Sequence, residues 1–342
     1  MTMSCWSCSG LKVRLGLFSL AMRILITGGF GFVGGRLATH LAQVGHQIIL
    51  GTRHSTASPE WLPQAEVAKI AWDDEEALER SCDGVNVIIH AAGMNAQDCA
   101  TDPITALAFN GLATAKLVAA ASRASVKKFI YLSTAHVYAS PLVGVITEET
   151  CPRNLHPYAT SHLAGEHAVL SASSREKLQG VVLRLSNTFG APMHKDANCW
   201  MLLVNDLCKQ AVQMRQLVLQ TSGLQHRDFI GLAEVSYVVE ELVGYNLLEQ
   251  AKVFNVGAGV SLSVIAMAQL IQQRCTEVLG FLPELQLKHS GVNEQSPTLT
   301  YSAHNLKTLG ISCKSKSNTA EIDKLLQFCQ TSFNQTKSIV HE

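Results

Sequence analysis

Short apolar runs alternate with longer amphipathic segments from residue 23 onward. Runs that are apolar at nearly every position predict strands of a parallel sheet, because both faces of such strands are buried. The expected strands are 23–27, 47–51, 67–72, 86–90, 127–133 and 180–185. Apolar residues at helical spacing predict helices between them, at 31–44, 74–82, 103–124 and 157–174. This order predicts an α/β fold with a doubly wound parallel (Rossmann) sheet.

The alternation loosens after about residue 186. Helices are expected at 200–214, 233–249, 262–275 and 319–333, with short strands at 217–220 and 253–256. We therefore expect a Rossmann domain over residues 22–185. A smaller C-terminal lobe over residues 186–335 should interleave with its sheet.

The first 21 residues precede the first expected strand. Lys12 and Arg14 stand before a short apolar run that faintly resembles a signal peptide, but the run is near the lower length limit for one. We expect residues 1–21 to be an N-terminal extension or a misassigned start, with Met22 as the alternative initiator. Cys5 and Cys8 form a CxxC pair there, but no second pair completes a zinc site.

Composition and charge narrow the function classes. Hydrophobic residues make up 47% of the chain, and 27 basic residues balance 27 acidic ones. A net charge of zero gives no basic field for nucleic acid or anionic lipid, so neither is an expected partner. We find no run of 18 or more apolar residues and expect no membrane span. Ten scattered cysteines favour a reducing cytoplasm, and the histidines show no spacing that predicts a metal site.

The strongest motif is Thr27-Gly28-Gly29-Phe30-Gly31-Phe32-Val33-Gly34, between the first strand and the first helix. Gly28 permits the tight turn, Gly31 lets the backbone approach a pyrophosphate, and Gly34 lets helix and strand pack closely. The motif predicts a dinucleotide site that includes Phe30, Phe32 and Val33. Residues 22–185 would then bind the dinucleotide, and residues 186–335 would mainly bind the substrate.

Further landmarks follow the glycine turn in a fixed order. They are His90-Ala91-Ala92-Gly93, Asn110, Ser133-Thr134, Pro157-Tyr158-Ala159-Thr160-Ser161-His162, Arg184 to Gly190, Arg227-Asp228-Phe229-Ile230 and Phe254 to Gly259. With the TGxxGxxG spacing, the pattern resembles the extended short-chain dehydrogenase/reductases over nearly all of residues 23–330. Within these it is similar to the NAD-dependent epimerase/dehydratase family, which acts on nucleotide sugars.

The resemblance implies contacts that the motifs alone do not establish. The implied cofactor contacts are Ala91, Ala92, Gly93, Asn110, Ser133, Tyr158 and His162. It also implies a homodimer in which helices 103–124 and 157–174 pair across the axis, although the same apolar faces could simply cover the sheet.

Tyr158 and Thr134 are the candidate catalytic pair. Hydride transfer at a sugar carbon needs a group that exchanges the alcohol proton, and a phenol can do this where nearby positive charge stabilises its phenolate. Thr134 would hold the same substrate oxygen beside Tyr158. The alternative is a helix-start aromatic residue and a strand-end hydroxyl without chemistry.

His162 departs from the family pattern, which has lysine four residues after the tyrosine. An imidazole can hydrogen-bond a ribose and, if protonated, can support the phenolate, but it is mostly neutral at pH 7. Three interpretations stay open: a functional substitution, a slower enzyme, or a catalytically silent protein that senses the dinucleotide.

A second departure concerns the reaction. The 4,6-dehydratases of the family follow the catalytic Ser or Thr with Asp-Glu, whereas Ala135 and His136 stand here. We therefore expect dehydration to be absent. His136 is a candidate substrate contact and a candidate additional acid or base.

The end of the second strand bears on the choice of cofactor. An acidic residue there would select NAD, but the sequence reads Leu50-Gly51-Thr52-Arg53-His54. Arg53 could accommodate a 2′-phosphate, so we expect NAD or NADP with NADP slightly favoured. Asp73 or Asp74 resembles the aspartate that contacts adenine in the family.

Asn187 and Arg227 match family positions that meet the nucleotide-sugar diphosphate or its flanks. A second arginine that is usual in the family is missing near Asn293 to Ser296. We expect an NAD(P)-dependent epimerase or 4-ketoreductase of a nucleotide-activated sugar. A reductase of a non-nucleotide carbonyl stays open.

Overall fold

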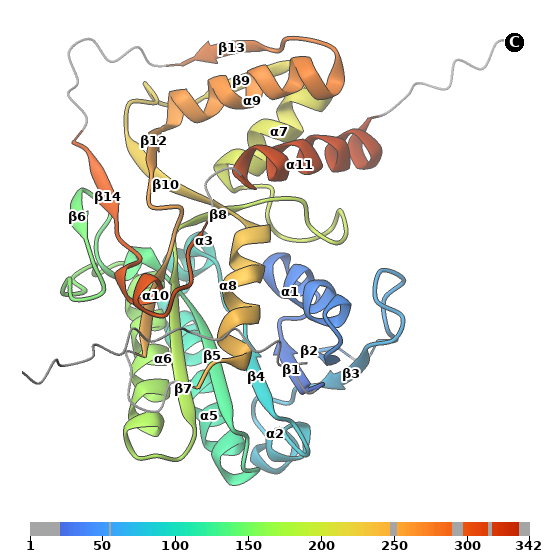
Figure 1. Ribbon diagram of the computed structural model, residues 1–342, viewed down its shortest axis with the longest axis vertical. Helices are drawn as coiled ribbons and strands as arrows, with labels where there is room; N and C mark the ends of the chain where they lie inside the picture. The colour runs from blue at the N-terminus through green and yellow to red at the C-terminus, as the bar shows by residue number, and fades with distance from the viewer. Residues whose placement is uncertain (1–20, 55, 247–251, 289–296, 314–316, 335–342) are drawn as a thin grey trace, which may run out of the picture.

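A seven-stranded parallel sheet forms the centre of the protein in a computed structural model that describes residues 21–54, 56–246, 252–288, 297–313 and 317–334 (Figure 1). Its strand order is β11-β7-β5-β4-β1-β2-β3. The strands are β1 (Arg23–Thr27), β2 (Gln47–Thr52), β3 (Glu66–Lys69), β4 (Val87–His90), β5 (Lys128–Thr134), β7 (Gln179–Leu185) and β11 (Val253–Val256). The expected doubly wound parallel sheet is therefore confirmed. The order reverses between β1 and β4, where doubly wound folds place their ligands.

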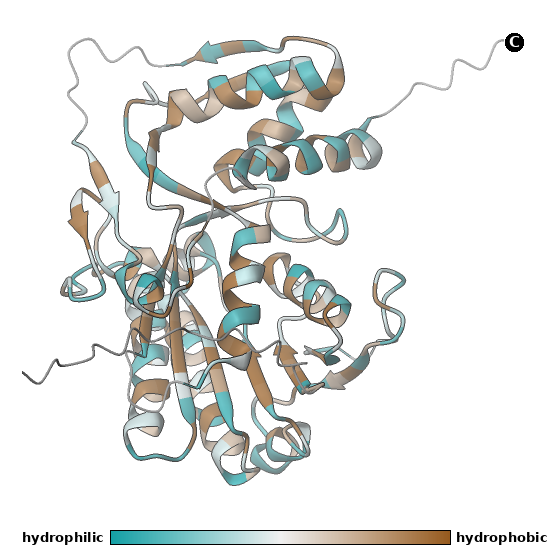
Figure 2. Ribbon diagram, in the orientation of Figure 1, coloured by the Kyte–Doolittle hydropathy of each residue, from teal (hydrophilic) through white to brown (hydrophobic). Residues whose placement is uncertain are grey.

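Helices cover both faces of this sheet because alternate strand residues point to opposite sides. Ile24 and Ile26 pack with α1 (Phe32–Gln43) and α8 (Leu232–Gly244), which also supply the buried Leu37 and Val239. Leu25 faces the other way, toward α2 (Glu75–Ser81), α5 (Thr114–Arg123) and α6 (Pro157–Ser174). Figure 2 shows the strands as largely hydrophobic, as burial on both faces requires.

The helix expected at 103–124 has a more complex form. It runs as α4 (Pro103–Ala106), a π-helical segment η1 (Leu107–Ala113) and α5, after a short α3 (Ala96–Thr101). By length and composition this 21-residue helix could cross a membrane, but half of its apolar window is buried inside the protein. That combination is weak evidence for a membrane span.

The C-terminal part adds a lobe above the carboxyl ends of the strands (Figure 1). Its helices are α7 (Leu203–Met214), α9 (Val264–Leu279) and α11 (Ser317–Phe333), whereas α10 (His304–Thr308) packs beside β11 of the main sheet. The strand β11 from this half joins the main sheet beside β7, so the two parts interleave. Arg36 on α1 ties them further, because it pairs at 2.6 Å with the fully buried carboxylate of Glu321 on α11.

Several short elements were absent from the sequence prediction, although the short strand expected at 217–220 is present as β9 (Gln216–Leu219). The strands β8 (Asn187–Phe189), β10 (His226–Gly231) and β12 (Ser261–Ser263) form one small sheet, β9 pairs with β13 (Glu284–Leu287), and β6 (Gly144–Ile146) pairs with β14 (Leu299–Tyr301). The short helix η2 (Ala135–Val137) was also missed. Cys5, Cys8 and the rest of residues 1–20 lie outside the described residues.

Candidate active site

The glycine turn after β1 lies against the end of β4. Gly28 has a φ of +67°, and a Cβ there would lie 2.8 Å from the Ala92 backbone nitrogen. A Cβ at Gly31 would lie 3.0 Å from the Gly28 carbonyl oxygen, and one at Gly34 would overlap that oxygen. The first turn of α1 has no side-chain cap and no acidic residue. Its free N–H groups therefore suit a negatively charged group such as a pyrophosphate.

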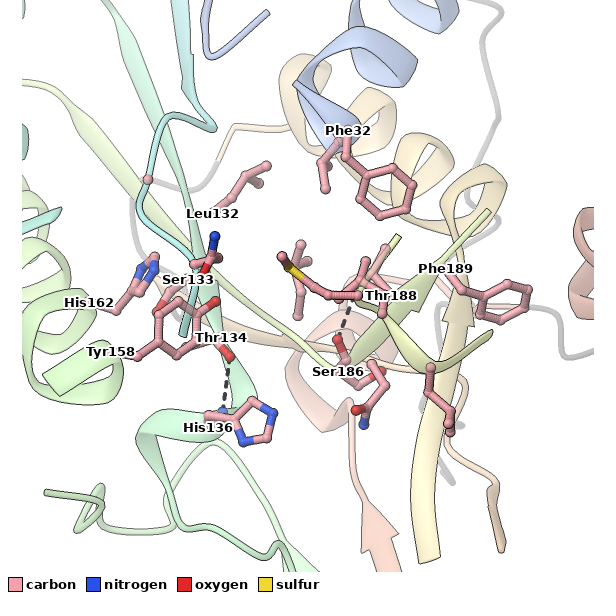
Figure 3. Close-up of a pocket in the computed structure, with 18 of the residues that line it drawn as sticks. Phe32, Leu132, Ser133, Thr134, His136, Tyr158, His162, Ser186, Thr188 and Phe189 are labelled. Carbon is pink, nitrogen blue, oxygen red and sulfur yellow. Dashed lines mark hydrogen bonds between the residues drawn. The ribbon is translucent and has the colours of Figure 1, made fainter. Parts of the chain in front are cut away.

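Two cavities open on either side of this turn and share Ala91 and Gly93. The smaller one, of about 240 Å³, lies at the ends of β1 and β2 and is lined by Gly28, Phe30, Gly31, Arg53, Ala92 and several other residues. The larger one, of about 410 Å³, includes Phe32, Val33, Ser133, Thr134, His136, Tyr158, His162, Asn187 and Arg227 (Figure 3). A ligand with two ring systems and a charged middle fits this arrangement, which is the shape of a dinucleotide.

Asp73 does not reach the smaller cavity. Its side chain is fully exposed and lies 3.6 Å from the Lys116 ammonium group, and Asp74 caps α2 by accepting a hydrogen bond from the Ala77 backbone nitrogen. Ile70 and Trp72 line the cavity instead. Alternate residues of an extended segment point the same way, so Ile70 and Trp72 face the cavity while Asp73 faces solvent.

Asn110 also lies outside both cavities. Its Oδ1 accepts a hydrogen bond from the Met94 backbone nitrogen at 2.8 Å, and its Nδ2 donates to Ser161 Oγ at 3.1 Å. Met94 itself lines the larger cavity. The side chain of Asn110 therefore holds the loop beside the cavity.

Thr134, His136 and Tyr158 meet on one wall of the larger cavity, at the end of β5 and the start of α6 (Figure 3). The Thr134 hydroxyl oxygen accepts a hydrogen bond from the His136 backbone nitrogen at 3.1 Å. Burial raises the pKa of Tyr158, and a hydrogen bond with Thr134 offsets only part of that rise. Tyr158 is therefore a neutral phenol near pH 7.

His162 lies one turn further along α6, with its ring edge-to-face against Tyr158 at a centroid distance of 4.6 Å. Burial lowers the pKa of His162 to about 4. The imidazole is consequently uncharged near pH 7, and the idea that a protonated His162 supports a Tyr158 phenolate is contradicted by its burial.

The nearest charged groups behind this wall neutralise each other. Ser133 Oγ donates to Glu166 at 2.5 Å, and Glu166 pairs with Arg184 at 2.6 Å, with both charged side chains buried. Arg184 therefore supplies no unpaired positive charge.

Arg227 and Asn187 also line the larger cavity. Burial lowers the pKa of Arg227, and among the described residues no carboxylate pairs with it. Asn187 is held by a hydrogen bond from its Nδ2 to the Asp228 carbonyl at 3.0 Å. A partly buried cation without a carboxylate partner suits an anionic ligand. Residues 293–296, where a second arginine was sought, fall in a range whose structure is not described.

Sequence reasoning missed the apolar wall of the larger cavity, formed by Met201 to Val204 with Phe229. It also missed Trp72 and Phe109, whose rings meet edge-to-face beside the smaller cavity. The position of Trp72 directly after a strand was a usable signal, but nothing in the sequence brings residues 201–204 to the sheet.

The fold and the two joined cavities define a Rossmann enzyme of the extended short-chain dehydrogenase/reductase type. Residues 24–257 match the NAD dependent epimerase/dehydratase family, and the chain belongs to that family.

Named relatives include both epimerases and dehydratases. The chain is 27% identical to the dTDP-D-glucose 4,6-dehydratase of Mus musculus, over 74% of this chain and 73% of that one. It is 27% identical to the UDP-glucose 4-epimerase of Erwinia amylovora, over 74% of this chain and 82% of that one. The structure of Thermus thermophilus UDP-glucose 4-epimerase in complex with NAD has a similar fold, with a TM-score of 0.73 and 23% identity, and covers 90% of this chain and 99% of that one.

The glycine turn gives a direct test of dinucleotide binding. Gly31→Val should abolish the calorimetric binding of NAD and NADP, because the added side chain would fill the space needed by a pyrophosphate. Gly244→Ala is the control, since nothing lies within 4 Å of a Cβ at that position. Wild-type affinity in Gly31→Val would refute the site.

Proposed function

We propose that the protein is an NAD(P)-dependent epimerase or 4-ketoreductase of a nucleotide-activated sugar. The observation that carries the proposal is the position of Tyr158 and Thr134 on one wall of a cavity that adjoins the glycine turn. The family membership supports hydride chemistry on such sugars, since the relatives named above act on UDP- and dTDP-sugars.

Each residue would act on a particular part of the substrate. Thr134 hydrogen-bonds the reacting oxygen, and Tyr158 exchanges a proton with it. Arg227 and Asn187 bind the diphosphate end, and the apolar wall at residues 201–204 excludes water from the reacting carbon. A bound nicotinamide dinucleotide would accept or supply the hydride.

The protonated state of Tyr158 favours the reduction of a ketone over the oxidation of an alcohol. A buried phenol without an adjacent cation is ready to donate its proton to an oxygen that gains negative charge, as in the reduction of a ketone. Removal of a proton from an alcohol needs the phenolate, which burial disfavours. We therefore infer that the cofactor-free site is prepared for ketone reduction.

Dehydration is the less supported reaction. The relatives include dehydratases, so the comparisons do not separate the two reactions. Our preference rests on Ala135 and His136, which provide no carboxylate after Thr134. Burial, with the nearby Arg227, lowers the pKa of His136, so this residue is neutral and could act as a base but not as a strong acid.

The buried, uncharged His162 favours a second candidate function, a dinucleotide-sensing protein without turnover. Such a protein would bind the cofactor as tightly as an enzyme does. Its Tyr158 would have no effect on any reaction, which separates it from the first proposal.

Two variants test the enzyme against the silent protein. Tyr158→Phe should lower turnover of UDP- and dTDP-sugars by about 100-fold or more, the usual contribution of a general acid, with cofactor affinity retained. His162→Lys should shift the pH profile of alcohol oxidation to lower pH, because a cation beside Tyr158 stabilises the phenolate. Absorbance at the nicotinamide band follows alcohol oxidation and ketone reduction, and chromatography of the sugar nucleotides follows epimerisation, which leaves the cofactor unchanged. No turnover across the sugar panel, with Tyr158→Phe unchanged in every property, would contradict the enzyme.

We also propose a slight preference for NADP over NAD. Arg53 lines the smaller cavity with its guanidinium 5.6 Å from the Phe109 ring centroid, and no acidic side chain lines that cavity among the described residues. Arg53→Ala should weaken NADP by about 1.5–3 kcal/mol, as for a lost charged hydrogen bond, and leave NAD nearly unchanged. Isothermal titration with both cofactors measures this, and equal losses would refute it.

The proposal also includes two functional parts of the chain: residues 22–185 bind the cofactor, and residues 186–335 mainly bind the substrate. It further includes a cytoplasmic location. The larger cavity takes Tyr158 and Thr134 from the first part and Arg227 and Asn187 from the second. All eight cysteines among the described residues are free, as a reducing compartment would keep them.

A homodimer through helices 103–124 and 157–174 is supported by apolar side chains on the first helix. Ile104, Leu107 and Leu112 are 83%, 54% and 56% exposed. Light scattering should give twice the 37.0 kDa chain mass, and Leu112→Glu should give the single-chain mass. A monomeric wild type would exclude this interface.

A further inference from the structure

The Tyr131 hydroxyl lies behind the candidate active site, on the far side of the His162 ring from the cavity. Tyr131 is in the middle of β5 and is 1% exposed. Its Oη is 2.9 Å from His162 Nδ1, and this is the hydrogen bond that the ring makes within the described residues. His162 therefore has one ring nitrogen held by β5, while the ring itself lines the larger cavity.

This contact depends on a gap in α6. A Cβ at Gly165 would lie 2.6 Å from Tyr131 Oη and 2.9 Å from its Cζ. Gly165 is three residues after His162, on the neighbouring turn of the same helix. The absence of a side chain at 165 thus makes room for the hydroxyl that reaches His162.

The Tyr131 hydroxyl lies near the Thr114 hydroxyl, the Asn110 carbonyl and His162 Nδ1, and of these His162 Nδ1 is at ordinary hydrogen-bond distance. The Asn110 carbonyl is 3.5 Å from Tyr131 Oη and already accepts the Thr114 hydroxyl at 2.7 Å. His162 Nδ1 is closer, and 3.5 Å is beyond the usual range of O–H···O bonds. The Tyr131 hydroxyl therefore donates to His162 Nδ1.

That direction determines the tautomer of His162. A neutral imidazole carries one ring proton, so a ring that accepts at Nδ1 carries its proton at Nε2. The Cε1–Nε2 edge of the ring faces Gly93, which lines both cavities: a Cβ at Gly93 would lie 3.6 Å from Cε1 and 3.8 Å from Nε2. The donor at Nε2 is thus directed to the place where the cavities join.

We propose that Tyr131 is a positioning residue that holds His162 in the Nε2–H tautomer, as a neutral hydrogen-bond donor to a hydroxyl of the dinucleotide. The proposal rests on the proposed function for the identity of the ligand. The His162 imidazole would donate a hydrogen bond, as the lysine of the family does, but it would not supply the positive charge of that lysine. His162 would then orient the dinucleotide through a hydrogen bond, and it would not make Tyr158 more acidic.

The first test needs no cofactor. Nitrogen-15 NMR of the histidine rings reports which ring nitrogen carries the proton, and His162→Gln identifies the His162 signals. Wild-type protein at pH 7 should show a protonated Nε2, and Tyr131→Phe should lose that preference. Tyr138→Phe is the matched control, because it removes another buried hydroxyl. That hydroxyl donates to Asn255 Oδ1 at a distance of 2.7 Å, and Tyr138 lines neither of the two cavities. A protonated Nδ1 in the wild type, or an unchanged tautomer in Tyr131→Phe, would overturn the proposal.

The second test measures the affinity for NAD and NADP by calorimetry. Tyr131→Phe should weaken the preferred cofactor about three- to tenfold, the value of one neutral hydrogen bond. In a His162→Lys background the same change should have less than a twofold effect, since an ammonium group has no tautomer, and Tyr138→Phe should match the wild type. An equal loss in both backgrounds would reduce Tyr131 to a structural role. A wild type that binds neither cofactor would contradict the proposed function and the ligand named here, while the NMR result would still decide the tautomer.

Discussion

The close packing of the Gly28 turn on the end of β4 is the constraint on which the site depends. The strand β1 lies between β4 and β2, and Thr27 and His90 at the ends of β1 and β4 share a hydrogen bond of 2.6 Å. The Gly28 backbone then passes Ala91 and Ala92 at a distance that no side chain would permit. This approach places the start of α1 over the point where the strand order reverses. The two cavities lie on either side of that point and therefore face one bound molecule.

The chemistry of the larger cavity depends on the burial of Tyr158 and His162 and on the lack of a cation beside Tyr158 in the part of the chain that the structure describes. His162 is buried and Tyr158 is partly buried, and for each the loss of water favours the uncharged form. The buried Arg184 is neutralised by Glu166, and Arg227 lines the same larger cavity as Tyr158. The pair Thr134 and Tyr158 consequently works through hydrogen bonds and geometry, and the unpaired cation of the cavity among the described residues is Arg227. This arrangement distinguishes the protein from a site in which lysine follows the tyrosine.

The parts of the site that could be predicted are those that the sheet itself positions. Parallel strands all end at one edge, so the strand ends carrying Gly28, Ala91 and Thr134 had to meet there. Asn110 and Asp73 were assigned as cofactor contacts by resemblance, and the sequence did not predict their local surroundings. Asn110 is occupied by the Met94 backbone, and Asp73 falls on the outward-facing side of its segment. The wall at residues 201–204 depends on lobe packing between distant segments, which no local pattern records.

The central claim is that Tyr158 stays a neutral phenol, because burial raises its pKa and the uncharged His162 supplies no positive charge to lower it. It is tested most directly by ultraviolet difference titration of the cofactor-free protein between pH 6 and pH 11, with Tyr158→Phe as the reference. The account predicts that Tyr158 contributes no phenolate absorbance below about pH 10, the ordinary pKa of tyrosine. A Tyr158 phenolate that forms near neutral pH would contradict it.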